Sequence, residues 1–233
     1  MTMRIGILGG LLIPALLITS ASPTKADDGW YLSSDFGALL IDDSGSHAVD
    51  TVGNAITFET EFDPGFVAQG AAGYAWRNFR FEGEASYRRA SADTLNVTAV
   101  TLAGVGAFNT ALPLKGGGDV TALGLMANGW YDFDLGAKWR PFIGGGVGIA
   151  NVSLNDVTGD IGGTPSPLAD DDDWVLAYQA GAGIGYQYNP SLTISLGYRF
   201  FATANPEFRD PDGVPFDGAF QTHSLMLGLR VQF

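Results

Sequence analysis

Segments of about ten residues in which apolar and polar side chains alternate restrict the fold of this chain more than any other feature. In residues 191–200 every odd position is polar or Gly, and every even position is apolar: Leu192, Ile194, Leu196, Tyr198 and Phe200. Residues 79–88 and 224–233 follow the same period of two. This period predicts β-strands with one apolar face, and ten residues is the length of a strand that crosses a bilayer at a tilt.

Eight such segments predict an antiparallel barrel. Their approximate bounds are 29–41, 65–76, 79–89, 120–133, 139–152, 174–188, 191–202 and 219–233. Long connections (42–63, 90–118, 153–172 and 203–218) alternate with short ones (77–78, 134–138 and 189–190). An even strand number with loops sorted by length in this way is typical of outer-membrane barrels. We therefore predict an all-β, eight-stranded, up-and-down transmembrane β-barrel with four long outer loops, three short periplasmic turns and periplasmic N- and C-termini.

The first 26 residues are typical of a secretory signal peptide. Arg4 precedes an apolar run over residues 5–18, which is shorter than the roughly 20 residues of a membrane-spanning helix, and the segment ends in Thr24, Lys25 and Ala26. An uncleaved membrane anchor is the alternative. We expect cleavage after Ala26, with residues 27–233 forming the barrel domain.

The arginines of the predicted strands indicate which face of the barrel is apolar. An arginine exposed to lipid at the bilayer centre costs roughly 2–4 kcal/mol. Burying five of them inside a soluble calyx, the alternative architecture, would be costly unless each were paired. Five arginines, Arg80, Arg88, Arg140, Arg199 and Arg230, lie opposite the apolar stripe, on the parity that also carries four carboxylates. We therefore expect a lipid-facing apolar exterior and a narrow polar lumen with a charge network of Asp35, Arg80, Glu82, Glu84, Arg88, Asp132, Arg140, Arg199 and Arg230.

Aromatic residues near the strand ends predict interfacial girdles, because their amphipathic rings prefer the two membrane surfaces. The separation of Tyr178 and Tyr186 by eight residues gives about 20 Å of height after tilting. Aromatic packing in an ordinary core is the alternative. The expected girdle comprises Trp30, Tyr74, Trp76, Tyr131, Trp139, Trp174, Tyr178, Tyr186 and Tyr188.

Acidic residues concentrate in the four long connections. The chain carries 25 Asp and Glu against 12 Lys and Arg, a formal charge of −13, whereas nucleic-acid binding draws on clustered Lys and Arg. We therefore expect solvated acidic loops and no nucleic-acid partner. Hard carboxylate oxygens bind Ca²⁺ and Mg²⁺, which makes a run of four aspartates a weak candidate for a metal site: Asp170, Asp171, Asp172 and Asp173.

The sequence contains no recognisable catalytic set or cofactor motif. The absence of Cys excludes thiol catalysis and disulfides. A lipid A-modifying barrel enzyme would need an activated nucleophile, but His223 and Ser224 are adjacent in a strand and point to opposite faces. We expect no catalytic residue and no cofactor, and we expect His223 at the membrane interface or the barrel rim.

Alternating glycines face the predicted lumen on two neighbouring strands. They are Gly144, Gly146 and Gly148 on one strand, and Gly181, Gly183 and Gly185 on the next. Either long side chains such as Met126, Trp130, Arg199 and Phe201 fill the lumen against this bare wall, or a water-filled passage remains. Eight strands leave an interior just wide enough for side chains to fill. We expect a filled lumen, and a narrow porin-like channel for small solutes is the alternative.

A family resemblance rests on two stretches, residues 125–152 (LMANGWYDFDLGAKWRPFIGGGVGIANV) and 177–201 (AYQAGAGIGYQYNPSLTISLGYRFF). They resemble small outer-membrane β-barrel proteins of the opacity and bacterial surface-antigen families. The terminal Phe233, with Leu229 and Val231 before it, resembles the signal read by the barrel assembly machinery. The resemblance implies a Gram-negative outer-membrane protein with a structural or surface-interaction role, antigen-like or adhesin-like. The implied partners are outer-membrane lipid and lipopolysaccharide, the assembly machinery during biogenesis, and a host or surface ligand at the loops.

Overall fold

The computed structural model describes residues 28–41, 44–49, 55–102, 106–161, 164–209, 215–218 and 220–233, and its regular elements in these ranges are β-strands. The expected signal peptide lies outside the described residues. None of the described residues belongs to a helix long and apolar enough to cross a membrane. The barrel strands are β1 (Gly29–Ile41), β4 (Gly65–Trp76), β5 (Phe79–Leu102), β6 (Gly106–Asp132), β7 (Trp139–Ile161), β8 (Thr164–Asn189), β9 (Leu192–Thr203) and β12 (Gln221–Gln232).

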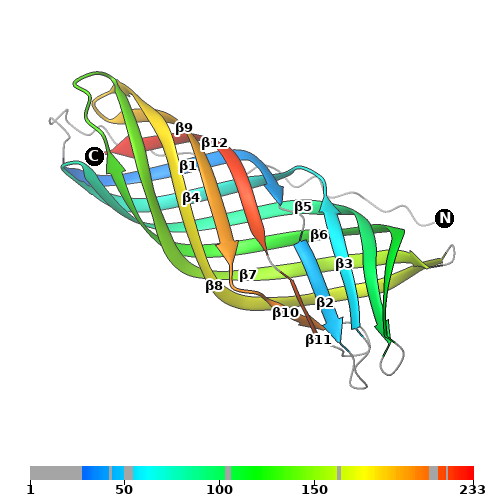
Figure 1. Cartoon of the computed structure of the whole chain (residues 1–233). Helices are drawn as coiled ribbons and strands as arrows, with labels where there is room; N and C mark the ends of the chain where they lie inside the picture. The colour runs from blue at the N-terminus through cyan, green and yellow to red at the C-terminus, as the bar shows by residue number, and fades with distance from the viewer. Residues whose placement is uncertain are drawn as a thin grey trace, which may run out of the picture.

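The eight barrel strands close into one antiparallel cylinder (Figure 1). Their order is β5-β4-β1-β12-β9-β8-β7-β6, and the pairing of β5 with β6 completes the circle. The first and last strands are neighbours, with Tyr31 opposite Gln232. The predicted eight-stranded barrel is confirmed, and the predicted bounds of β1 and β4 agree with the structure at both ends.

Tight turns connect the strands at the end where β12 finishes. Arg77 in the β4–β5 turn adopts a left-handed φ of 55°, and its N–H donates to the Asp28 carboxylate at 2.5 Å. The Asn189 side-chain oxygen accepts the N–H groups of Ser191 (2.9 Å) and Leu192 (2.8 Å). These bonds satisfy backbone donors that a tight turn removes from the sheet.

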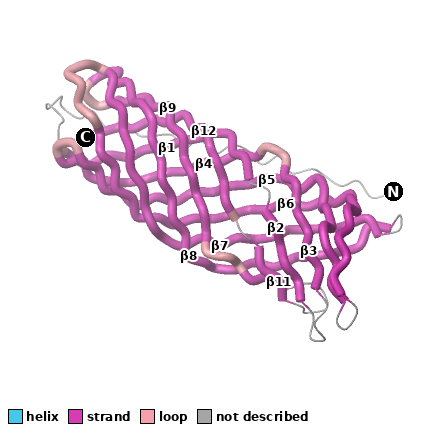
Figure 2. The backbone as a smooth tube through the Cα atoms, viewed as in Figure 1, coloured by secondary structure: helices cyan, strands magenta, loops and turns pink. Residues whose placement is uncertain are grey.

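At the opposite end, much of the chain predicted as loop continues as β-structure (Figures 1 and 2). The β5–β6 ribbon runs out to the pair Leu102–Gly106, and the β7–β8 ribbon to Ile161–Thr164. Four shorter strands add to this extension: β2 (Ser44–Val49), β3 (Ala55–Phe62), β10 (Glu207–Arg209) and β11 (Pro215–Gly218). Strand β3 pairs with the outer part of β5, and β2 joins β3 to β11. The predicted connections are long, as expected, but much of their described length is paired β-structure and not irregular loop, because antiparallel pairing satisfies the backbone beyond the lipid as well as within it.

Side-chain exposure alternates along the barrel strands. In β4, Val67, Gln69, Ala71, Gly73 and Ala75 are buried, while the residues that alternate with them are more exposed. Large apolar side chains of the other parity lie on the outer surface, and Leu176 is 72% exposed. A continuous apolar band of this kind marks a membrane or partner surface, and it has the lipid-facing arrangement of transmembrane barrels.

The lumen has two zones. Toward the turns it holds charged and amide side chains. At the loop end it holds what we call the apolar zone, which the prediction of a polar lumen did not include. Its buried members near the loop ends of the strands are Leu39, Ile41, Val67, Ala90, Val120, Ala122, Ala150, Val152, Ala177, Phe201, Phe208 and Phe220.

Candidate functional site

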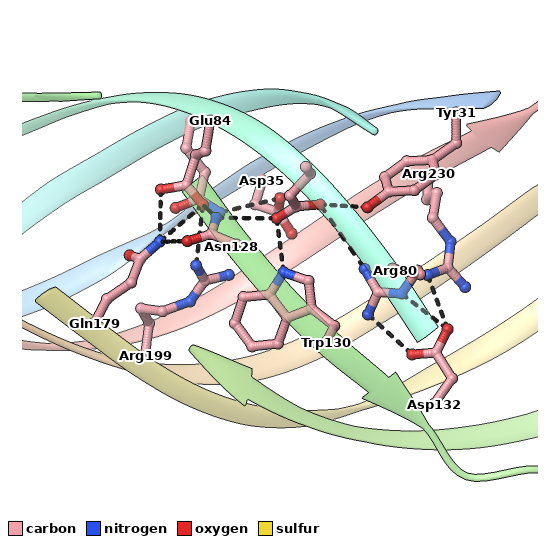
Figure 3. Close-up of polar contacts among 12 residues, drawn as sticks. Tyr31, Asp35, Arg80, Glu84, Asn128, Trp130, Asp132, Gln179, Arg199 and Arg230 are labelled. Carbon is pink, nitrogen blue, oxygen red and sulfur yellow. Dashed lines mark hydrogen bonds and ion pairs between the residues drawn. The ribbon is translucent and has the colours of Figure 1, made fainter. Parts of the chain in front are cut away.

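The turn-side part of the lumen is organised around one carboxylate that serves two arginines (Figure 3). Arg80 donates to both oxygens of Asp132, from Nε at 2.8 Å and from Nη2 at 2.9 Å. Arg230 donates to the same carboxylate at 3.2 Å. Such bidentate, charge-assisted bonds are the strong ones. They tie β5, β6 and β12 together across the lumen.

A second cluster surrounds Glu84, deeper in the lumen (Figure 3). This carboxylate is 3% exposed. It accepts hydrogen bonds from Asn128 (2.8 Å), Gln179 (3.2 Å) and Arg199 (3.0 Å). The Arg199 guanidinium also lies 4.4 Å from the Trp130 ring centroid. Four strands thus contribute to one closed polar cluster.

Glu82 links the two clusters. It accepts hydrogen bonds from Tyr31 and Trp130, each at 2.7 Å, and from Asn128 at 3.1 Å. The uncharged members Tyr31, Asn128 and Gln179 were not predicted. The sequence does carry a signal for them: they occupy inward-facing positions of their strands. A filled polar lumen needs amide and hydroxyl groups at such positions to satisfy its charges.

Six of the nine predicted network residues are joined by these bonds, and three are not. Asp35 accepts a hydrogen bond from Gln69 at 3.3 Å. Within the described parts of the chain, neither Asp35, Arg88 nor Arg140 forms an ion pair. Asp35 and Arg140 instead line a small cavity of about 40 Å³, together with Ser33, Thr193 and Ser195. This volume holds about three water molecules and is far below the roughly 300 Å³ of a small ligand pocket.

The glycine wall of β7 and β8 lets long side chains lie flat across the lumen. A Cβ atom on Gly144 would stand 2.5 Å from the Trp130 ring, and one on Gly148 would stand 2.8 Å from the Met126 sulfur. A Cβ on Gly181 would meet the Arg199 side chain at 3.1 Å. Phe201 differs from the expectation, because it approaches Gly124 of β6 and not this wall. Side chains therefore occupy the space that the glycines leave.

The predicted girdle residues lie on the outer surface, exposed or half-buried. Near the turns they form edge or tilted ring pairs, including Trp30–Tyr74 (5.4 Å between centroids) and Trp139–Tyr186 (4.8 Å). Near the loops, Tyr178 lies 6.3 Å from Phe200. His223 joins this second group, with its Nδ1 2.5 Å from the Tyr198 hydroxyl oxygen. Ser224, by contrast, is buried on the inner side.

The four consecutive aspartates do not form a metal site. Successive strand residues point to opposite faces, so their carboxylates diverge. Asp171 and Asp173 accept the backbone N–H groups of Arg209 (2.8 Å) and Glu207 (3.0 Å), and Asp172 accepts from Asn151 (2.7 Å). Among the residues with described side chains, no group of three or more His, Asp or Glu could hold a metal ion. The described residues therefore give the candidate cation site no support.

Arg89 and Asp119 form an exposed ion pair on the loop side of the apolar band. The Arg89 guanidinium donates to the Asp119 carboxylate at 2.6 Å, and this bond lowers the pKa of Asp119 below its ordinary value. A lowered carboxyl pKa stabilises the fold above the unfolded-state pKa of about 4, and the stabilisation is lost as the pH falls through the folded-state value.

We accordingly expect Asp119→Asn to reduce the free energy of unfolding at pH 7 by at most about 1 kcal/mol, as is usual for an exposed pair. The difference between variant and wild type should shrink as the pH falls below about 4 and should disappear once the pH is below the lowered pKa of Asp119 in the folded chain. Equilibrium unfolding in urea at pH 7 and at a pH below that pKa measures both quantities. A difference that is unchanged at low pH would contradict this account of the pair.

Comparison with known proteins identifies the family. The model of the outer membrane protein beta-barrel domain matches residues 11–233. Opacity protein opA51 of Neisseria gonorrhoeae is 28% identical over 134 residues, which cover 49% of this chain and 53% of the relative. Outer membrane protein PagN of Salmonella typhimurium is 29% identical over 108 residues, which cover 40% of this chain and 45% of the relative. The chain thus spans about half the length of the curated relatives it matches.

Among solved structures, two are similar to this chain over most of their length. Neisserial surface protein A (NspA) is 20% identical with a TM-score of 0.49, over 88% of this chain and 97% of that one. OprG from Pseudomonas aeruginosa is 17% identical with a TM-score of 0.49, over 90% and 98%. The match of the family model over residues 11–233 shows that this chain belongs to the outer membrane protein β-barrel domain family.

Proposed function

We propose that this outer-membrane barrel is a closed membrane anchor for a surface-interaction or structural role, antigen-like or adhesin-like, and not an enzyme. One observation carries the proposal: the lumen is filled by a bonded polar network on the turn side and by packed apolar side chains on the loop side. A barrel filled in this way leaves the exposed β-extension as the part available for function.

The chemistry of the extension supports this role. Most acidic residues of the chain lie in segments 42–63, 90–118, 153–172 and 203–218, which place them beyond the apolar band. A negative surface steers positively charged partners and repels anionic ones. We infer that the ligand at the loops is a basic host or surface molecule, and that the turns and both termini are periplasmic.

The lipid-facing surface suggests the remaining partners. Lipid and lipopolysaccharide would surround the apolar band. The barrel assembly machinery would read the end of β12, where Leu229 (50% exposed) and Phe233 (61% exposed) lie on the outer surface near Val231. Deleting Phe233 would then slow assembly more than it destabilises the folded barrel.

The closed lumen predicts that the refolded protein does not conduct. In planar bilayers we expect no reproducible conductance steps, because moving ions past the Glu84 cluster would require breaking its buried charge pairs. The narrow porin-like channel is the competing function. Reproducible steps that a bulky residue at Gly146 or Gly183 abolishes would establish a channel and reject the closed anchor.

A further inference from the structure

Arg88 is a buried charge without a carboxylate partner. The residue is 1% exposed. Its Nη1 donates to Ser86 Oγ at 2.7 Å, and its guanidinium stacks on Phe201, 3.7 Å from the ring centroid. Its Nε is buried without a hydrogen-bond partner, and no described carboxylate lies within ion-pair distance of its guanidinium. Glu84 acts on this charge only from a longer range. A buried charge without a directly bonded partner is costly, so an anion that reached Arg88 would gain by pairing with it.

Two further buried polar atoms near Phe201 also lack partners. They are the hydroxyls of Thr203, two residues further along β9, and of Thr222, which faces Phe201 across the β9–β12 pairing. Both residues are less than 10% exposed. Unsatisfied buried groups are rare in folded proteins, and a hydroxyl can donate to an anion. Both threonines lie at the loop ends of their strands, so they add unsatisfied hydroxyls within the apolar zone, while Arg88 lies deeper in the lumen.

The apolar zone extends from the level of Arg88, which is paired with Val67 and Ala122, toward the loop end, where Ala90 faces Val120. It is lined by aliphatic side chains from several strands, among them Leu39, Val67 and Val152. Phe208 enters this zone from β10 and is 4% exposed, with its ring 5.6 Å from that of Phe216. The ring of Phe208 thus occupies apolar volume that does not belong to the barrel wall.

Strand β10 is held less firmly than a barrel strand. It has three residues and pairs with the four-residue β11. On its other side, the N–H groups of Glu207 and Arg209 donate to the side chains of Asp173 and Asp171 of β8 and not to a backbone ladder. Withdrawing Phe208 therefore breaks few backbone bonds and leaves the eight-stranded barrel intact.

We propose that the loop end of the lumen binds a single-chain amphiphile with a monoanionic headgroup, of which a fatty carboxylate is the simplest form. The carboxylate pairs with Arg88, and the alkyl chain takes the place of Phe208 in the apolar zone. One unpaired guanidinium favours one negative charge. The Glu84–Arg199 cluster lies on the turn side of Arg88 and closes the site at that end. This binding function therefore goes beyond the closed anchor and is compatible with it.

Equilibrium binding of radiolabelled dodecanoate to the full chain in lipid nanodiscs tests the proposal, with empty nanodiscs subtracted. We expect saturable binding of one dodecanoate per barrel. Arg88→Gln should weaken it at least 10-fold, and Arg88→Lys should restore part of the affinity because it keeps the charge. Arg77→Gln removes a charge from an exposed turn and should leave binding unchanged. Phe208→Ala should strengthen binding, because the ring no longer competes with the chain.

Dodecan-1-ol provides a test on the wild-type protein alone, which does not depend on the folding of any variant. As a competitor it should be at least 10-fold weaker than unlabelled dodecanoate, because it cannot pair with Arg88. The different mobility of boiled and unboiled samples on gels verifies folding of each variant. Equal binding by wild type and Arg88→Gln, equal competition by the alcohol, or no excess over empty nanodiscs would each overturn the proposal.

Discussion

Replacing Glu84 with alanine is expected to reduce the free energy of unfolding by about 3–5 kcal/mol. The carboxylate is buried, and it accepts hydrogen bonds from Arg199 at 3.0 Å and from two side-chain amides. Because the site is buried, water does not replace these bonds when the carboxylate is removed. Its removal leaves the Arg199 charge buried and unpaired. Urea unfolding of the barrel in lipid vesicles, followed by tryptophan fluorescence, measures the loss.

A double-mutant cycle separates the ion pair from general packing. Removing both partners, in Glu84→Ala with Arg199→Ala, should cost less than the sum of the two single changes, because neither charge is then left alone. Asp119→Ala breaks an exposed pair of comparable length and serves as the control, with at most about 1 kcal/mol expected. Additive effects in the cycle, or equal losses at Glu84 and Asp119, would show that the network contributes little.

The membrane-spanning part of the fold was predictable because two environments impose strict alternation on it. Lipid on one side and a narrow lumen on the other leave each strand residue a choice between apolar and polar with a period of two. The predicted and observed bounds of β1 and β4 agree for this reason. In both strands, a short turn or a break in the apolar–polar alternation also marks where the strand ends.

The β-extension was not predictable on the same grounds. Residues 90–102 continue β5 and residues 106–119 precede the predicted start of the next strand, but neither stretch has lipid on one face. Without that constraint the alternation weakens, although the backbone of the ribbon remains paired. Backbone groups are the same in every residue, so this pairing leaves little trace in the sequence.

The lumen residues were predictable where their charge determines which face of the strand they occupy. Arg80, Arg199 and Arg230 had to face inward because lipid excludes arginine, and the carboxylates on the same parity followed. The apolar zone followed no such rule, although Leu39, Val67 and Val152 occupy inward positions near the loop ends of their strands. Apolar residues on both faces at one end of several strands were the available signal, and it indicates a lumen that changes character along its axis.

Replacing Leu227 with arginine is expected to destabilise the barrel by roughly 2–4 kcal/mol, the cost of an arginine facing lipid near the bilayer centre. Leu227 is 64% exposed and lies in the middle of β12, opposite Phe36 and Leu196 of the neighbouring strands. Leu135, in the β6–β7 turn, is 66% exposed, so Leu135→Arg is a control matched in exposure and in chemistry, with a change within about 0.5 kcal/mol expected in water.

If the apolar exterior were exposed to water, the two substitutions would have equal and small effects, because exposed leucines tolerate arginine. Only lipid around Leu227 makes the loss of stability at this position larger than the loss at Leu135. Unfolding in vesicles of a bilayer-forming lipid measures both variants under one condition. A cost at Leu227 that does not exceed the cost at Leu135 would reject the orientation on which the lumen network, the girdles and the closed anchor all depend.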